Sequence, residues 1–315
     1  MKSKFNFDFI KNSKTYYTIS LVIIIAGIIL SFVMGVKLDI EFSGGTIMTF
    51  VYDNEISSAD FEKSFEDALG GMDVTVTTGT EFTTGKNKFQ VEITSKEGLN
   101  SDRQFELTEA LSAQYAENNL ELIQSSDVSP TSGKEFFLKC LVAVIFSSIV
   151  LIIYIAVRFK NIGGWRAGLS GIIALFHDIF VVYTVFVVCG MDIDANFMAV
   201  VLTILGYSIN DTIVIYDRIR ENQILNGKKN KMPLAELTNL SVNQSLTRSF
   251  NTSITTCIAM LTVTIVAMVY GVDSIISFSF PVMIGMISGT YSSVCLAGPI
   301  WVKLEEMRKD TKKTK

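Results

Sequence analysis

The chain has 315 residues, of which 49% are hydrophobic and only 18% are charged. Soluble domains carry about 25% charged residues, so this composition excludes an ordinary soluble protein and indicates a membrane protein. The formal net charge of −4 gives no support for nucleic-acid binding, and none is expected.

The apolar residues are grouped in six stretches. Each stretch approaches or exceeds the roughly 20 residues that a helix needs to cross about 30 Å of hydrocarbon. The stretches are residues 16–36, 136–157, 167–189, 195–216, 254–270 and 275–301. The fifth is short unless its polar start, from about Ser245, belongs to the same helix. Leucines at helical spacing predict a short amphipathic cytoplasmic helix over 233–246.

Lysine and arginine residues orient these stretches. They gather before the first stretch, between the second and third, between the fourth and fifth, and after the sixth. All four groups then lie on one side of the membrane, which the positive-inside rule makes cytoplasmic. Both termini are therefore expected in the cytoplasm. Residues 37–135, with 19 acidic and 7 basic side chains, are expected outside.

This topology divides the chain into segments. We expect a cytoplasmic segment over 1–15, the first transmembrane helix over 16–36, and an external part over 37–135. Helices two to six lie within 136–303, with a cytoplasmic loop over 217–246, and a basic tail covers 304–315. The first apolar run is longer than the 7 to 15 residue apolar region of a signal peptide, so an uncleaved helix is expected. The four cysteines fall in or beside the spans, as small buried hydrophobes do.

The external part has short elements in the order β-α-β-β-α-β. Strands are predicted at 45–52, 72–78, 88–94 and 120–126, and helices at 57–69 and 102–117, the second capped by Ser101. This order is the ferredoxin-like motif. The expected fold is therefore an α-helical membrane protein of six transmembrane helices, with one ferredoxin-like α+β extracytoplasmic domain between helices 1 and 2.

No catalytic constellation is apparent in the external part. It contains no histidine and no cysteine, and its carboxylates are spaced as solvated side chains usually are. We expect neither an enzyme nor a metal site, but a domain that contacts a partner or a polypeptide.

Asp211, beside Asn210, interrupts the fourth stretch about 9 Å inside its cytoplasmic end. An intramembrane carboxylate costs about 2.5 to 3.5 kcal/mol, so it usually serves a function. Arg248 enters the fifth stretch at comparable depth. Two interpretations stay open for each residue: Asp211 titrates or forms a static interhelical hydrogen bond, and Arg248 pairs with it or extends back to the interface.

His177 and Asp178 lie near the middle of the third stretch, and His177 is the only histidine. Adjacent residues do not share a helix face, so one of the two could make a static hydrogen bond while the other points elsewhere. A functional role is the alternative. Glycine pairs spaced four residues apart, at 164 and 168 and at 285 and 289, predict close helix packing.

Several motifs resemble the SecF family of protein-export membrane subunits, within the resistance-nodulation-division superfamily. The most specific are GYSIND at 206–211 and DRIREN at 217–222. The match continues with LDIEFSGG at 38–45, VSPTSG at 128–133, the His177-Asp178 pair and SVNQSLTR at 241–248. In the family the first loop often reads closer to Leu-Asp-Phe-Thr-Gly-Gly. The differences here leave the Gly44-Gly45 turn intact.

The resemblance implies a subunit of the bacterial cytoplasmic membrane that pairs with a SecD-like partner. Together they would use the proton motive force, or sodium, to help an unfolded polypeptide leave the SecYEG channel on the outer side. H⁺ or Na⁺ would be transported, with no cofactor, and membrane lipid surrounds the helices. Asp211 matches the ion-conducting carboxylate, with Asn210 beside it, and Arg248 matches a basic residue that influences it. His177-Asp178 matches a second polar pair.

Three other classes were weighed. A small-molecule or lipid exporter of the same superfamily would share the intramembrane carboxylates, but it would have duplicated external domains in a longer chain. An intramembrane aspartyl protease would need a Gly-x-Gly-Asp motif, which the sequence lacks. A non-coupling membrane scaffold predicts that Asp211 is replaceable by Leu or Asn.

Overall fold

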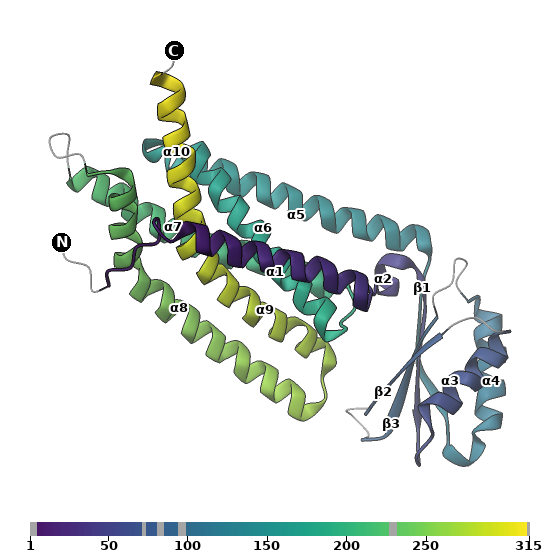
Figure 1. Ribbon diagram of the computed structural model, residues 1–315. Coiled ribbons are helices and arrows are strands. Elements are labelled where there is room, and N and C mark those ends of the chain that lie inside the picture. The colour runs from purple at the N-terminus through teal and green to yellow at the C-terminus, as the bar shows by residue number, and fades with distance from the viewer. Residues whose placement is uncertain (1–4, 71–73, 81–84, 94–98, 227–231, 314–315) are drawn as a thin grey trace.

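A computed structural model describes residues 5–70, 74–80, 85–93, 99–226 and 232–313. A bundle of long helices is joined at one end to a four-stranded sheet, and both chain ends lie at the opposite end of the bundle (Figure 1). In the described residues, six helices are long and apolar enough to cross a membrane, which confirms the predicted number.

The helices follow the predicted stretches. They are α1 (Ser13–Met34), α5 (Pro130–Arg158), α6 (Gly164–Cys189), α7 (Ala195–Leu225), α8 (Leu234–Tyr270) and α9 (Asp273–Ser292). A π-helical turn, η3 (Ser293–Ala297), connects α9 to α10 (Gly298–Lys313). The core of the bundle lies around α6, α7 and α9, whereas α1, α5 and α8 expose apolar side chains outward.

Glycine in α9 permits its close approach to α7. A Cβ placed on Gly289 would lie 2.9 Å from the Cβ of Ser208, and one on Gly285 would lie 2.6 Å from Ile204. Real Cβ atoms do not approach this closely, so larger residues would separate the helices. The small-residue spacing predicted for this helix is therefore a packing contact.

Helix α8 is continuous over 37 residues, so the predicted amphipathic helix and the fifth stretch form one element, and the polar start from about Ser245 belongs to the span. No proline or glycine interrupts it after Pro233, and its serine and threonine hydroxyls bond back to carbonyls one turn earlier, as Ser241 does to Leu237 and Ser245 to Ser241. At 1.5 Å per residue, α8 is about 55 Å long and extends well beyond the hydrocarbon region.

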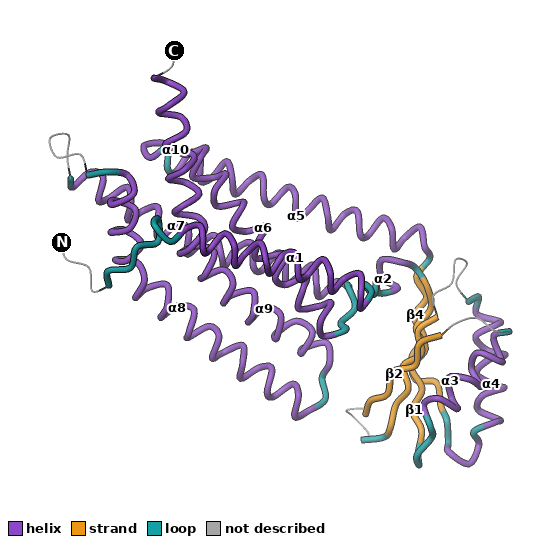
Figure 2. Tube along the Cα trace, in the orientation of Figure 1, coloured by secondary structure: helices purple, strands orange, loops and turns teal. Residues whose placement is uncertain are grey.

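The sheet lies between α1 and α5 in the chain. Its elements are β1 (Gly45–Tyr52), α3 (Ser58–Leu69), β2 (Val74–Thr80), β3 (Asn87–Ile93), α4 (Ser101–Gln114), the 3₁₀ turn η1 (Ala116–Asn118) and β4 (Glu121–Val128). The strands are antiparallel in the order β2-β3-β1-β4, and both helices cover the face away from the bundle (Figure 2). Phe50, Phe61, Phe65 and Phe89 fill the core between them.

Element boundaries differ from the sequence-based ones at a few places. Asn100, not Ser101, caps α4, because its side chain accepts from the Arg103 N–H at 2.9 Å. That helix also ends at Gln114, before the 3₁₀ turn. Met72 and Thr94, predicted strand ends, lie outside the described residues.

The link from α1 to the sheet is held against the turn between α6 and α7. The Ile193 N–H donates to the Lys37 carbonyl at 2.9 Å, and the Asp39 N–H donates to the Ile193 carbonyl at 3.2 Å. A short helix, α2 (Ile40–Ser43), leads into Gly44 and Gly45, whose φ angles are 81° and 152°. Only glycine adopts this pair of angles readily, which accounts for the two residues.

Candidate functional site: buried carboxylates of the helix bundle

Asp211 lies on the inward side of α7 and is only 3% exposed. Its Oδ2 atom has no hydrogen-bond partner in the described part of the chain. Two groups of α8 interact electrostatically with this carboxylate, namely the Arg248 guanidinium and the Ser249 hydroxyl. The Ser249 hydroxyl lies nearby without reaching hydrogen-bond geometry. A buried carboxylate with an unused oxygen is costly in hydrocarbon, so this side chain is not a satisfied packing contact.

Arg248 is exposed and faces a cavity at the end of the bundle where both termini lie. This cavity of about 450 Å³ is also lined by Asp217, Arg218 and Gln244. Among the described residues, Arg248 forms no ion pair with Asp211, so the expected electrostatic relation acts at longer range than a salt bridge. Asp217 instead pairs with Arg158 at 3.2 Å and Arg220 at 2.8 Å.

Asn210 does not share the buried environment of Asp211. It is exposed on the outer side of α7, because consecutive helix positions point about 100° apart. Sequence adjacency therefore grouped two residues that the helix separates.

Asp178 lies in a cage of serine hydroxyls and is 0% exposed. Ser208 of α7 donates to its Oδ2 at 2.7 Å, while Ser288 and Ser292 of α9 donate to Oδ1 at 2.7 Å and to Oδ2 at 2.6 Å. The carboxylate thus connects three helices, α6, α7 and α9. Three O–H donors satisfy both carboxylate oxygens, so Asp178 is a fully paired buried polar group.

His177 is in contact with Asp178, which excludes the alternative in which one of the two residues points elsewhere. Its Nδ1 atom lies 3.2 Å from Asp178 Oδ1, and its ring centroid lies 5.8 Å from that of Tyr291. The imidazole is 5% exposed, and Nε2 has no partner among the described groups.

Sequence reasoning missed the serines and the network around them. Thr212 and Ser293 are joined through their hydroxyls at 2.8 Å, and Ser293 donates to the Ser208 carbonyl at 3.2 Å. Ser208 and Asp211 are three residues apart on α7, so the Asp178 cage lies about one turn from Asp211. Ser288 and Ser292 are four residues apart on one face of α9, and this spacing was the feature of the sequence that could have identified them.

A second group of carboxylates lies where the sheet meets the bundle. Burial, together with the charges of Asp192 and Asp39, raises the pKa of Glu92 on β3 to about 7, against the opposing effect of Lys37. Glu41 accepts from the Ala195 N–H at 3.0 Å at the start of α7. Among the described residues, no group of three or more histidine, cysteine or acidic side chains could hold a metal ion.

Comparisons with known proteins agree with the motifs. Residues 108–307 match the model of the family described as protein export membrane protein SecD/SecF, C-terminal. Protein translocase subunit SecF of Alicyclobacillus acidocaldarius is 34% identical over 309 residues, covering 97% of this chain and 96% of that protein. Protein translocase subunit SecDF of Bacillus subtilis is 33% identical over 306 residues, and this chain spans 39% of its length.

The fold has a counterpart among solved structures. The crystal structure of SecDF, a translocon-associated membrane protein from Thermus thermophilus, superposes with a TM-score of 0.79 and 28% identity, covering 96% of this chain and 39% of that one. The family match spans most of the helices, and the identity to SecF extends over almost the whole chain. The chain therefore belongs to the SecD/SecF family of protein-export membrane proteins and is a SecF-type member of it.

Proposed function

We propose that this chain is an accessory subunit of the Sec protein translocase, driven by an ion motive force and acting late in polypeptide export. The observation that carries the proposal is the geometry of Asp211, a buried carboxylate with an unused oxygen beside a cation that does not pair with it. Family membership supports the translocase part, because the relatives are named as translocase subunits.

Ion coupling requires a titratable group whose access alternates between the two sides of the membrane. A proton crossing 100 mV releases about 2.3 kcal/mol. Ionised Asp211 attracts Arg248, and protonation or ion binding would remove that attraction and let α8 move relative to α7. The cavity beside Arg248 and Asp217 offers ions a route from one side.

Asp178 suits this task less well than Asp211. Its two oxygens already accept three hydroxyl donors, whereas the Oδ2 atom of Asp211 has no partner among the described residues and is open to an added ion. We assign Asp178 and His177 a supporting role: their contacts hold α6, α7 and α9 together while α8 responds to Asp211.

A SecD-like subunit is the proposed partner. Polar residues at membrane depth lie exposed on α7 and α8, namely Thr203, Asn210, Asn251 and Thr255. Polar groups are unfavourable against lipid tails, so a second protein surface should cover them. The Bacillus subtilis relative carries a similar region within a longer single chain, which supports a second six-helix unit beside this one.

The sheet and its helices are proposed to form a ferredoxin-like domain on the outer side, with both termini in the cytoplasm. The β-α-β-β-α-β order and the strand order support the domain type. The excess of lysine and arginine at the opposite end supports the orientation. There the domain could contact the emerging polypeptide.

Two measurements test the proposal. Copurification of the tagged chain in mild detergent should recover a second six-span protein with its own external domain. Recovery of the chain alone as a trimer would instead favour an exporter. Polypeptide export in vesicles should gain an increment from an imposed ion gradient only when this chain is present, and an increment that is equal without it would contradict the coupling.

A further inference from the structure

Residues 5–10 form an irregular segment that lies against α8 before the chain enters α1 (Figure 1). Helix α1 packs mainly on α6, whereas α8 packs mainly on α7 and α9. The segment, which we call the strap, therefore connects two helices that have different neighbours. It lies at the end of the bundle where both termini lie, and the proposed function assigns it no role.

Asn243 of α8 binds the backbone of the strap at two points. Its Oδ1 atom accepts from the Phe7 N–H at 2.9 Å, and its Nδ2 atom donates to the Phe7 carbonyl at 2.7 Å. The side chain is buried, and Nδ2 also donates to the Asn239 carbonyl within α8 at 2.7 Å. Because both contacts with Phe7 are made to main-chain atoms, they fix the position of the strap backbone relative to α8.

Asn239, one helical turn before Asn243, holds the next residues of the strap. Its Oδ1 atom accepts from the Ile10 N–H at 3.1 Å, and its Nδ2 atom donates to the Asp8 carboxylate at 2.6 Å. Residues four apart share one face of a helix, so the two asparagines form a polar row beneath the strap. The strap is thus hydrogen-bonded to α8 along residues 7–10.

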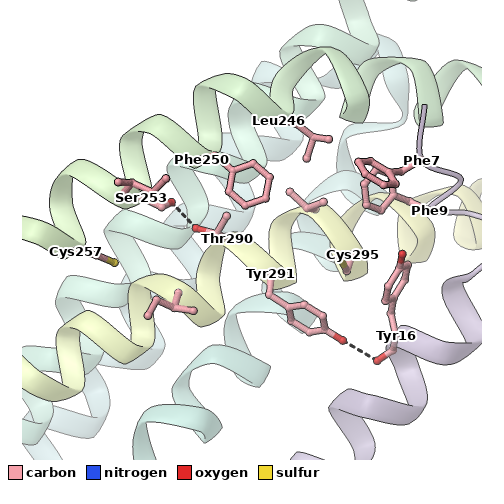
Figure 3. Close-up of a pocket in the computed structure, with 13 residues that line it drawn as sticks. Phe7, Phe9, Tyr16, Leu246, Phe250, Ser253, Cys257, Thr290, Tyr291 and Cys295 are labelled. Atoms are coloured by element: carbon pink, nitrogen blue, oxygen red, sulfur yellow. Dashed lines mark hydrogen bonds between the residues drawn. The ribbon is translucent and has the colours of Figure 1, made fainter. Parts of the chain in front are cut away.

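Phe9 anchors the strap in the core of the bundle. Its side chain is buried, and its ring centroid lies 6.2 Å from that of Tyr16 on α1. The Tyr16 carbonyl in turn accepts from the Tyr291 hydroxyl of α9 at 2.9 Å (Figure 3). Polar bonds to α8 and aromatic packing against α1 therefore hold the same short segment.

The connection from the strap to α1 has little slack. The Asn12 N–H donates to the Asp8 carbonyl at 3.3 Å, and the Ser13 N–H donates to the Ile10 carbonyl at 3.3 Å. These bonds form a closed turn immediately before α1, which begins at Ser13. A displacement of residues 7–10 is consequently passed to α1, because no extended linker lies between them to absorb it.

The attachment of the strap and the proposed ion site lie on one rigid element. Asn243 precedes Arg248 by five residues, or about 7.5 Å along the uninterrupted helix α8. Any movement of α8 that changes the distance between Arg248 and Asp211 therefore also moves Asn243. At its far end, α1 leads through residues 37–39, which bond to Ile193, into the sheet.

We propose that the strap transmits displacements of α8 to α1, and through α1 to the sheet, with Asn239 and Asn243 as its attachment points. This transmission rests on the proposed function, because ion coupling at Asp211 is what displaces α8. It adds the mechanical path by which a change of charge at Asp211 reaches the opposite end of the bundle.

Hydrogen exchange of the full chain tests the attachment without reference to ion coupling. In the double variant Asn239→Ala and Asn243→Ala, the Phe7 and Ile10 N–H groups lose their acceptors. Alanine favours helix, so α8 stays intact. Peptides that cover residues 5–12 should exchange at least about tenfold faster than in the unmodified chain, because hydrogen bonds of ordinary strength are lost. Unchanged exchange in these peptides would overturn the proposal.

Asn226→Ala is the matched control for this experiment. Asn226 lies at the end of α7, and its side chain donates to the Asn222 carbonyl of its own helix at 3.0 Å. Exchange of the strap should be the same as in the unmodified chain. Exchange as fast as in the double variant would show that the strap responds to any disturbance at this end of the bundle, and it would refute the specific attachment.

Export driven by an ion gradient tests the transmission. The double variant should lose most of the gradient-dependent increment in vesicles and keep its ATP-driven export. Cysteines introduced at Asn6 and Glu236, two exposed residues that line a common cavity, allow a short bismaleimide to join the strap to α8 again, in a background without the native cysteines. Crosslinking should restore the increment. A full increment in the double variant, or no restoration after crosslinking, would overturn the proposal.

Failure of the strap and failure of the proposed function are distinguishable. The absence of a gradient-dependent increment in the unmodified chain would refute the proposed function and the transmission with it. An increment that is present in the unmodified chain, lost in Asp211→Asn and retained in the double variant would refute the strap alone.

Discussion

Asp211 and Arg248 are electrostatic neighbours on α7 and α8 that do not form an ion pair in the described structure. Asp211 is buried with a free Oδ2 atom, while Arg248 is exposed to a cavity. A fixed salt bridge would hold both helices in one arrangement. No such bridge joins the two side chains among the described residues, and this is the arrangement that the proposed coupling requires.

The serine cage of Asp178 should contribute measurably to stability. Ser288→Ala removes one hydroxyl donor to a buried carboxylate, and hydrogen bonds to charged groups are worth about 1.5 to 3 kcal/mol. We expect a lower thermal midpoint of the purified protein in detergent. Ser148→Ala, which removes a bond to a carbonyl of its own helix, is the control and should change little. Equal effects of the two variants would argue against a structural cage.

The external domain should fold alone. Residues 45–128 include the whole sheet and a core of their own. The isolated segment should show a mixed helix and strand spectrum and melt cooperatively. Phe61→Ala, at a fully buried ring, should cost about 3 to 5 kcal/mol, whereas Phe105→Ala, at a ring that is 70% exposed, should cost little. A disordered spectrum for the unmodified segment would contradict this independence.

The orientation of the chain is testable by labelling. Single cysteines at Ser58 on α3 and at Gln223 on α7, in a background without the four native cysteines, should react from opposite sides of the membrane. An impermeant reagent added to intact cells should label only the cysteine at position 58. Comparable labelling at both positions would contradict the proposed topology.

Glu92 should make the junction between sheet and bundle pH-dependent. Because the pKa of this carboxyl is raised to about 7 in the folded chain, the protonated form favours the packed junction. Its stabilising effect is complete below about pH 4.5 and is lost as pH rises through 7. The hydrogen-exchange protection factor of residues 37–39, which is corrected for the base-catalysed intrinsic rate, should therefore fall between pH 5 and 8. Glu92→Gln should abolish this dependence, and an unchanged profile would exclude Glu92 as its source.

The fold was largely predictable from hydrophobic length and period. The six spans and the strand β1 lie where the sequence places them, because stretches of about 20 apolar residues and a short run rich in β-branched and aromatic residues leave few alternatives. The sequence left the continuity of α8 open, because its serine and threonine residues from about Ser245 could belong to the span or precede it. Their hydroxyls bond to carbonyls within the helix.

The site was predictable only in part. Asp211, Asp178 and His177 stand out because charge is rare in a span. The partners of Asp178 do not, because Ser208, Ser288 and Ser292 are ordinary residues that converge only when α7 and α9 pack together. Tertiary contacts between distant helices leave no local signal in one sequence.

Export driven by an ion gradient, compared between Asp211→Asn and Asp217→Asn, tests the central claim most directly. Both variants remove one carboxylate from α7, but Asp217 is half-exposed in ion pairs that are worth little. Asp211→Asn should fold and assemble yet lose the whole gradient-dependent increment in vesicles, with ATP-driven export intact, and Asp211→Glu should restore part of it. Asp217→Asn should keep the increment. Normal gradient-dependent export by well-assembled Asp211→Asn would contradict the account.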